Sequence, residues 1–192
     1  MTAARDATTD RRTAILDAAE RLFAESGFDA TPTARVATEA GVPKGLVFYY
    51  FPRKIDLLLT LLDERLPTHD PTEAEMVAEA GDPVGSLVRL DRHLQLADHT
   101  SLTLRTIIFR ESGTHPEVAR RLRTLRSGLV ALTEAVIERA VGMVLDPELR
   151  SQAAHTFVAV MLDRASTARA GGPTPDASGP ARLVSLAVAA TH

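Results

Sequence analysis

The stretch of sequence that decides the fold covers residues 30–54 and reads ATPTARVATEAGVPKGLVFYYFPRK. Thr31 followed by Pro32 predicts the start of a short helix, because a threonine oxygen can cap free backbone N–H groups and the fixed φ of proline suits the first helical position. Gly41 predicts the end of that helix, since glycine readily takes the left-handed conformation there. Pro43 starts a second helix two residues later. Two short helices separated by a glycine turn indicate a helix-turn-helix.

The second of these helices, residues 43–50, is the one that we expect to contact DNA. Lys44 brings positive charge, and Gly45 has no Cβ, so the backbone can approach a duplex closely. Tyr49 and Tyr50 can donate hydrogen bonds to phosphate oxygens or lie along base edges.

Residues 48–51 are four consecutive aromatic residues. A helix distributes four successive side chains around its whole circumference, so these rings cannot all face one core. We expect Val47 and Phe51, four residues apart, to point inward. For each ring taken alone, burial in the core is the alternative, because aromatic side chains bury a large apolar area.

Arg53 and Lys54 form a basic pair at the start of a third helix. The helix macrodipole favours acids at this end by about 0.3–1 kcal/mol, so positive charge here needs another cause. A DNA phosphate would supply it, because free N–H groups, the positive helix end and the basic side chains all attract the same anion. A solvated basic pair without a ligand is the alternative.

Residues 10–66 resemble the DNA-binding domain of TetR-family transcriptional regulators. The resemblance is carried by the amphipathic segment AILDAAERLFAESGF, the turn residues Thr31 and Gly41-Val42, the pair Lys44-Gly45, and the run YYF followed by Lys54 and Leu57. It implies a three-helix DNA-binding head. It also implies a C-terminal helical domain that encloses a small-molecule pocket and dimerises through its last two helices.

Three positions depart from the family pattern, namely Pro43 where the family often has serine, Leu46 where it often has threonine, and Phe48 where tyrosine is common. Each departure removes a hydroxyl that in similar proteins often contacts phosphate, so we expect that contact to shift to other side chains. The residues that we expect to contact DNA are Thr31, Thr33, Lys44, Gly45, Leu46, Tyr49, Tyr50, Arg53 and Lys54.

The composition of the 192-residue chain restricts its chemistry. The absence of cysteine excludes disulfides, thiol catalysis and cysteine-rich zinc sites. The net charge is −3, and nine Lys and Arg face ten Asp and Glu over residues 1–66, so a DNA-binding surface must be local. No stretch approaches the roughly 20 apolar residues of a membrane span. We therefore expect a cytoplasmic protein.

Helix-breaking residues divide the chain. We expect a disordered terminus over residues 1–9, a helix-turn-helix domain over residues 10–66 with its motif at about 32–51, and an effector-binding and dimerisation domain over residues 67–192. The first helix is expected to begin at Thr9 or Asp10 and to end near Ser26. Further helices are expected over residues 72–80, 84–99, 101–112, 116–142, 147–168 and 180–190, with a loop over residues 171–180. The fold class is therefore all-α.

Signatures of catalysis and metal binding are absent from the sequence. It contains no H-E-x-x-H motif, phosphate-cradling glycine loop or serine elbow. The six histidines are scattered, and none follows another at four-residue spacing. We expect no catalytic residue, no metal and no cofactor, and hence no enzyme.

Residues 153–162, AAHTFVAVML, are apolar almost all the way round the helix, which favours burial on more than one side. One face would pack on its own domain and the other on a second copy of the chain, as the resemblance implies. The expected dimer contacts are Val158, Val160 and Met161. A central helix of a monomeric bundle is the alternative.

The C-terminal domain is rich in aliphatic residues, which suits a pocket for a mainly aliphatic effector, as the resemblance implies. The expected lining residues are Leu90, Leu94, Ile108, Phe109, Leu125, Leu129 and Phe157.

The sequence thus predicts a homodimeric transcriptional regulator, most simply a repressor, that binds a palindromic DNA operator and leaves it when a small molecule binds. The alternative is a helical small-molecule binding protein or enzyme whose N-terminal domain no longer binds DNA.

Overall fold

The computed structural model describes residues 2–94, 96, 111, 113–169 and 176–190. Within these ranges every regular element is a helix, as the sequence predicted. The chain divides into two compact units. Unit 1 comprises Met1–Pro67 and Thr100–Leu122, and unit 2 comprises Thr68–His99 and Arg123–His192. The helix predicted over residues 101–112 lies outside the described residues except for Glu111. Residues 171–175 of the loop predicted over residues 171–180 also lie outside them, and the loop ends earlier than predicted, because a helix begins at Ser178.

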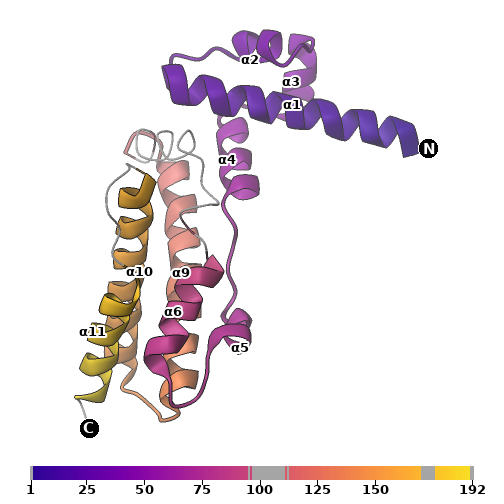
Figure 1. Ribbon diagram of the computed structural model, residues 1–192. Coiled ribbons are helices and arrows are strands. Elements are labelled where there is room, and N and C mark those ends of the chain that lie inside the picture. Colours follow the sequence, from indigo (N-terminus) through magenta and orange to yellow (C-terminus); the bar gives the residue numbers. More distant parts are fainter. Residues whose placement is uncertain (1, 95, 97–110, 112, 170–175, 191–192) are drawn as a thin grey trace. The chain divides into compact units, whose positions relative to one another are not determined.

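Unit 1 begins with α1 (Thr2–Ser26), α2 (Thr33–Glu39), α3 (Lys44–Tyr50) and α4 (Lys54–Arg65). Helix α1 packs on α2 and α4, and α2 packs on α3 (Figure 1). The apolar stripe of α1 is buried in one cluster with α4, whose members from these two helices include Ile15, Leu16, Leu22, Phe23, Leu57, Leu58, Leu61 and Leu62.

Helix α1 begins earlier than predicted. The sequence placed its start at Thr9 or Asp10, after a disordered terminus, whereas the helix here already includes Thr2. Its predicted end is confirmed, because Gly27 follows Ser26 with a φ of 88°. Only glycine takes that conformation without strain.

Unit 1 also takes in residues from much later in the chain. Val118 is fully buried in the α1–α4 cluster, Leu122 packs against it, and Arg121 forms an ion pair with Asp63 of α4. These three residues belong to the first turns of α9 (Pro116–Val141), whose remaining residues belong to unit 2. The DNA-binding domain that the sequence predicts, residues 10–66, does not include them.

Unit 2 contains the short helices η1 (Pro71–Glu73) and α5 (Ala74–Val77), followed by α6 (Pro83–Leu94). Helices α10 (Pro147–Arg169) and α11 (Ser178–Ala189) pack on each other, and α11 also packs on α6 (Figure 1). The helix predicted over residues 72–80 is therefore two short pieces that end at Val77.

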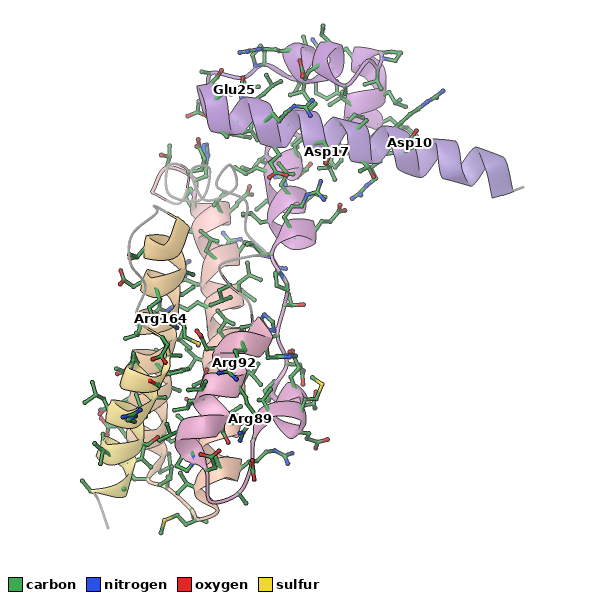
Figure 2. The ribbon with its side chains drawn as sticks, in the orientation of Figure 1. Asp10, Asp17, Glu25, Arg89, Arg92 and Arg164 are labelled. Atoms are coloured by element: carbon green, nitrogen blue, oxygen red, sulfur yellow. The ribbon has the colours of Figure 1, made fainter. Side chains whose placement is uncertain are left out.

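One buried cluster holds unit 2 together, and its members include Leu87, Leu90, Leu94, Leu132, Val136, Ile137, Phe157 and Met161. An ion pair crosses from α10 to α6, with Arg164 Nη1 2.7 Å from Asp91 Oδ1. Figure 2 labels Arg164 on α10, and it labels Arg89 and Arg92 on α6.

Candidate nucleic-acid interface

The turn between α2 and α3 has the geometry of a helix-turn-helix. Gly41 has a φ of 66°, and its N–H donates to Thr38 O at 3.1 Å. The N–H of Val42 donates to Ala37 O at 2.9 Å, so two bonds close the end of α2. Helix α3 then begins after Pro43, as predicted. A residue with a Cβ would strain the left-handed position, so Gly41 is required by the turn.

Helix α3 has one buried and one exposed face. Val47 is fully buried and Phe51, which follows the helix, is 3% exposed, so the predicted inward pair is confirmed. Phe48 is 42% exposed and Tyr49 is 76% exposed. The four aromatic rings therefore do not all enter the core, as the circumference argument predicted. The exposed face also carries Lys44 and Gly45.

Thr31 is the clearest correction among the expected DNA contacts. Its side chain is fully buried, and its hydroxyl donates to Gly27 O at 2.7 Å and to Leu22 O at 3.2 Å. The N-cap of α2 is Pro32, which has no side-chain cap. Thr31 therefore fixes the turn after α1 and has no hydroxyl to offer a phosphate.

Three other expected contacts are half-buried in unit 1: Thr33 at the start of α2, Leu46 in the first turn of α3, and Tyr50 at its end. Tyr50 packs against the core cluster, with its ring edge-on to Tyr49 at 5.2 Å between centroids. Tyr50 therefore supports Tyr49 and exposes less of its own ring.

Arg53 has acidic partners within unit 1. Its guanidinium Nη2 lies 2.6 Å from Asp56 Oδ1, and its Nη1 lies 3.5 Å from Glu117 Oε1. The hydrogen bond from Arg53 lowers the pKa of Asp56, which also accepts the Arg53 N–H at 2.9 Å. The sequence predicted that a DNA phosphate would supply the negative charge that favours Arg53, but Asp56 and Glu117 supply it within unit 1.

Lys54 lies against the turn that follows α1. Its Nζ is 4.4 Å from the centroid of the Phe28 ring and donates to Asp29 O at 3.2 Å. Burial lowers the pKa of Lys54, and the charges of Asp29 and Glu111 partly oppose that effect. The ammonium is half-exposed, so a phosphate contact at Lys54 stays a prediction.

Sequence reasoning missed a buried acid behind this turn. Glu111 is 3% exposed, and its Oε1 accepts the backbone N–H of Phe28 at 3.0 Å. The imidazole of His115 lies 3.3 Å from Glu111 Oε2 and packs edge-on against the Phe28 ring. Nothing in the local sequence marks a pairing between residues 83 positions apart.

Known proteins are similar to this chain in sequence and in fold. Residues 15–61 match the family model described as "Bacterial regulatory proteins, tetR family". The transcriptional regulator TtgR of Pseudomonas putida is 35% identical over 98 residues, which are 50% of this chain and 46% of TtgR, so the chain spans about half the length of that relative. The transcriptional repressor AcnR of Corynebacterium diphtheriae is 30% identical over 173 residues, 86% of this chain and 84% of AcnR. The chain belongs to the TetR family.

A solved structure extends the likeness of this TetR-family regulator to both units. NalD of Pseudomonas aeruginosa, described as the secondary repressor of the MexAB-OprM multidrug efflux pump, is 25% identical with a TM-score of 0.67. The match covers 94% of this chain and 98% of NalD. Across the described residues, none of the helices has the length and apolarity needed to cross a membrane.

The structure brings together some of the residues that we expect to line the effector pocket of this TetR-family protein. Leu90, Leu94, Leu129 and Phe157 lie in the core cluster of unit 2, and Leu125 is half-buried. Ile108 and Phe109 lie outside the described residues. One groove of about 500 Å³ in unit 2 is lined by Pro71, Thr72, Ala135, Glu138, Arg139 and Gly142, so none of the described pocket candidates lines it.

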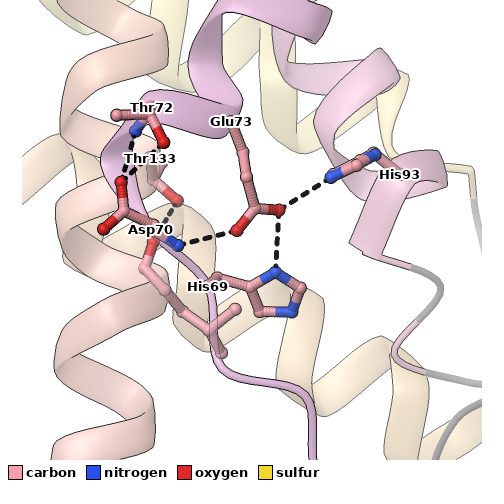
Figure 3. A network of polar contacts seen from close by, with 7 residues as sticks. His69, Asp70, Thr72, Glu73, His93 and Thr133 are labelled. Carbon is pink, nitrogen blue, oxygen red and sulfur yellow. Dashed lines mark hydrogen bonds and ion pairs between the residues drawn. The ribbon is translucent and has the colours of Figure 1, made fainter.

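A polar network joins η1 to α6 in unit 2 (Figure 3). Glu73 Oε2 lies 2.8 Å from His93 Nε2 and 3.1 Å from His69 Nδ1, while its Oε1 accepts the Asp70 N–H at 2.7 Å. Burial raises the pKa of Glu73, but these three hydrogen bonds together outweigh it and lower the pKa overall. Among the described residues, no group of three or more histidines and acids is placed to hold a metal ion.

Two of the three dimer contacts expected on α10 lie in the core of their own unit. Val158 is fully buried and Met161 is 2% exposed, and both belong to the core of their own unit, while Val160 is half-buried. Two of the exposed large apolar residues in the described part of unit 2 lie on α11, where Leu183 is 71% exposed and Leu186 is 66% exposed; the others are Met76, Met143 and Val144. The spacing of Leu183 and Leu186 opposite Val184 and Val188 was a signal that sequence reasoning could have used.

Proposed function

We propose that this TetR-family regulator is a repressor that binds a palindromic DNA operator as a homodimer and leaves it when a small effector binds. The observation that carries the DNA-binding step is the face of α3. Lys44, Gly45, Phe48 and Tyr49 are exposed there, while Val47 anchors the helix in the core. A helix whose one face is packed in the core and whose opposite face is exposed can enter a major groove. A cytoplasmic location is part of this proposal, because a regulator that binds DNA works where the DNA is.

The proposed dimer rests on α11. Leu183 and Leu186 are two large apolar side chains left in solvent one turn apart on the same helix, next to a face that is already buried. Apolar side chains gathered on one face indicate an interaction surface. Two-fold homodimers are the commonest oligomers, and a two-fold protein pairs with a palindromic site whose halves lie roughly 34–36 Å apart.

The proposed effector is mainly aliphatic. Leu90, Leu94, Leu129 and Phe157 lie together in the apolar core cluster of unit 2. A ligand that entered among them would gain about 25 cal/mol for each Å² of its own apolar area that it buries. The effector drives release only by binding more tightly to the DNA-free state. To shift the ratio of the two states from 1:99 to 99:1, the effector must bind the favoured state about 10⁴-fold more tightly than the other. That difference corresponds to on the order of 220 Å² of apolar area that is buried in the favoured state only.

A direct test measures binding of the protein to the intergenic DNA that flanks its gene, by fluorescence anisotropy at several salt concentrations. Tyr49→Ala should weaken binding by about 10-fold or more, since Tyr49 is the most exposed ring of α3. The matched control is Met76→Ala, which removes a 66% exposed side chain from unit 2 and should leave affinity unchanged. A protein that binds no such fragment while retaining its helices would contradict the proposal and favour a helical small-molecule binding protein.

A further inference from the structure

The exposed large hydrophobic side chains of unit 1 are confined to two neighbouring positions. Among the described residues of that unit, they are Phe48 and Tyr49 of α3. Both follow Val47 directly in α3, and Val47 is fully buried. An aromatic ring left in solvent forgoes the free energy of burial, so this pair marks a surface that a partner covers.

The two rings differ in what they can bind. Tyr49 has a hydroxyl and can exchange hydrogen bonds with a phosphate or a base edge. Phe48 has no polar atom and cannot exchange hydrogen bonds with DNA, so an apolar group of a base suits its exposed surface. On the base edges of the major groove, the apolar group is the C5-methyl of thymine.

Lys44 restricts how the Phe48 ring is presented. It lies one turn earlier on the same face, and its Nζ is 5.8 Å from the ring centroid. A cation at that distance is attracted to the face of the ring by the ring quadrupole. The ammonium therefore covers one side of the ring and leaves the rest of it to contact DNA.

We propose that Phe48 is a specificity-determining residue that recognises the methyl group of one thymine in each operator half-site. This inference rests on the proposed DNA-binding function and adds the base that α3 selects. Removing that methyl should weaken binding about fourfold per half-site, which is the value of one buried CH₂ group, about 0.8 kcal/mol. Removing it from both half-sites should weaken binding about 15-fold, since the two effects multiply.

The test replaces thymines of a bound operator one at a time with deoxyuridine, which lacks only the methyl group. Each DNA is titrated with the wild-type chain, with Phe48→Ala and with Phe48→Leu. We expect one position per half-site where deoxyuridine costs the wild-type chain about fourfold and costs Phe48→Ala less than 1.5-fold. Phe48→Leu keeps an apolar side chain and should retain part of the sensitivity. Phe48 is 42% exposed, so these variants should keep their fold, which circular dichroism can check.

The outcomes separate this inference from the proposed function. If the wild-type chain binds the operator but tolerates deoxyuridine everywhere, or if the sensitive position stays sensitive in Phe48→Ala, the assignment of Phe48 is overturned while DNA binding stands. If the wild-type chain binds no DNA, both are overturned. Tyr49→Phe serves as the control, because it should keep the deoxyuridine sensitivity while losing the hydrogen bonds of the Tyr49 hydroxyl.

Discussion

Replacing Glu111 with alanine should destabilise the head of the molecule, although Glu111 lies far from it in sequence. The carboxylate is 3% exposed and accepts the Phe28 N–H at 3.0 Å, beside the imidazole of His115. Glu111→Ala leaves that buried N–H without a partner and removes a hydrogen bond to a charged group. Such a loss costs about 2–3 kcal/mol.

Glu111→Gln is the matched variant, because an amide oxygen can still accept the Phe28 N–H. It replaces a charged hydrogen bond with a neutral one and should cost about 1 kcal/mol. Glu25→Ala removes an acid of unit 1 whose side chain is 64% exposed, and it should change stability by less than about 0.5 kcal/mol. The order of cost is therefore Glu111→Ala, Glu111→Gln and Glu25→Ala.

Urea unfolding followed by circular dichroism measures these differences. With a slope of about 2 kcal/mol per molar urea, Glu111→Ala should lower the midpoint by about 1–1.5 M. Hydrogen exchange gives a local readout, since the Phe28 amide should exchange faster in Glu111→Ala than in Glu111→Gln. If Glu111→Ala matches Glu25→Ala in both measurements, the buried hydrogen bond contributes nothing and the reasoning fails.

Four further predictions follow from other parts of the chain. Leu183→Glu with Leu186→Glu should convert a dimer into a monomer in analytical ultracentrifugation with the helical content unchanged, whereas a wild-type monomer would exclude α11 as the interface. Thr31→Val should lower the stability by about 1–2 kcal/mol, because it loses the hydrogen bonds of the Thr31 hydroxyl to Leu22 O and Gly27 O. It should leave the salt dependence of DNA binding unchanged. If the slope of log affinity against log salt concentration falls by about one, Thr31 is a phosphate contact after all. The pKa of Glu73 is lowered from its ordinary value of 4.5, so ionised Glu73 stabilises the fold above pH 4.5 and this stabilisation should be lost as the pH falls through the lowered pKa. Glu73→Gln should therefore flatten the dependence of the unfolding free energy on pH in that range. An unchanged dependence would contradict the prediction. In calorimetric titrations, a validated effector should bind more weakly to protein that holds the operator than to free protein. The factor should equal that by which the effector weakens operator binding, because the coupling is reciprocal. Equal affinities in the two titrations would exclude the switch.

The sequence alone predicted the features that depend on neighbouring residues. Gly41 and Pro43 placed the turn between α2 and α3 correctly, because a positive φ and a fixed φ are properties of single residues. The apolar stripe of α1 followed from helical periodicity, and its end was correctly predicted near Ser26, where Gly27 takes a positive φ. The inward direction of Val47 and Phe51 followed from their spacing.

The tertiary structure decided which partner each side chain meets. Thr31 has the chemistry of a helix cap, but the turn before it brings Gly27 O and Leu22 O within reach of its hydroxyl. The periodicity of residues 153–162 did not predict which face of the helix is buried, because a helix that is apolar all round has no distinct polar face. Packing against the other helices of unit 2 decided that Val158 is buried. Glu111 and Phe28 meet only because the chain returns to the head after 83 residues. Local propensity acts over a few residues, whereas these contacts depend on which helices pack together.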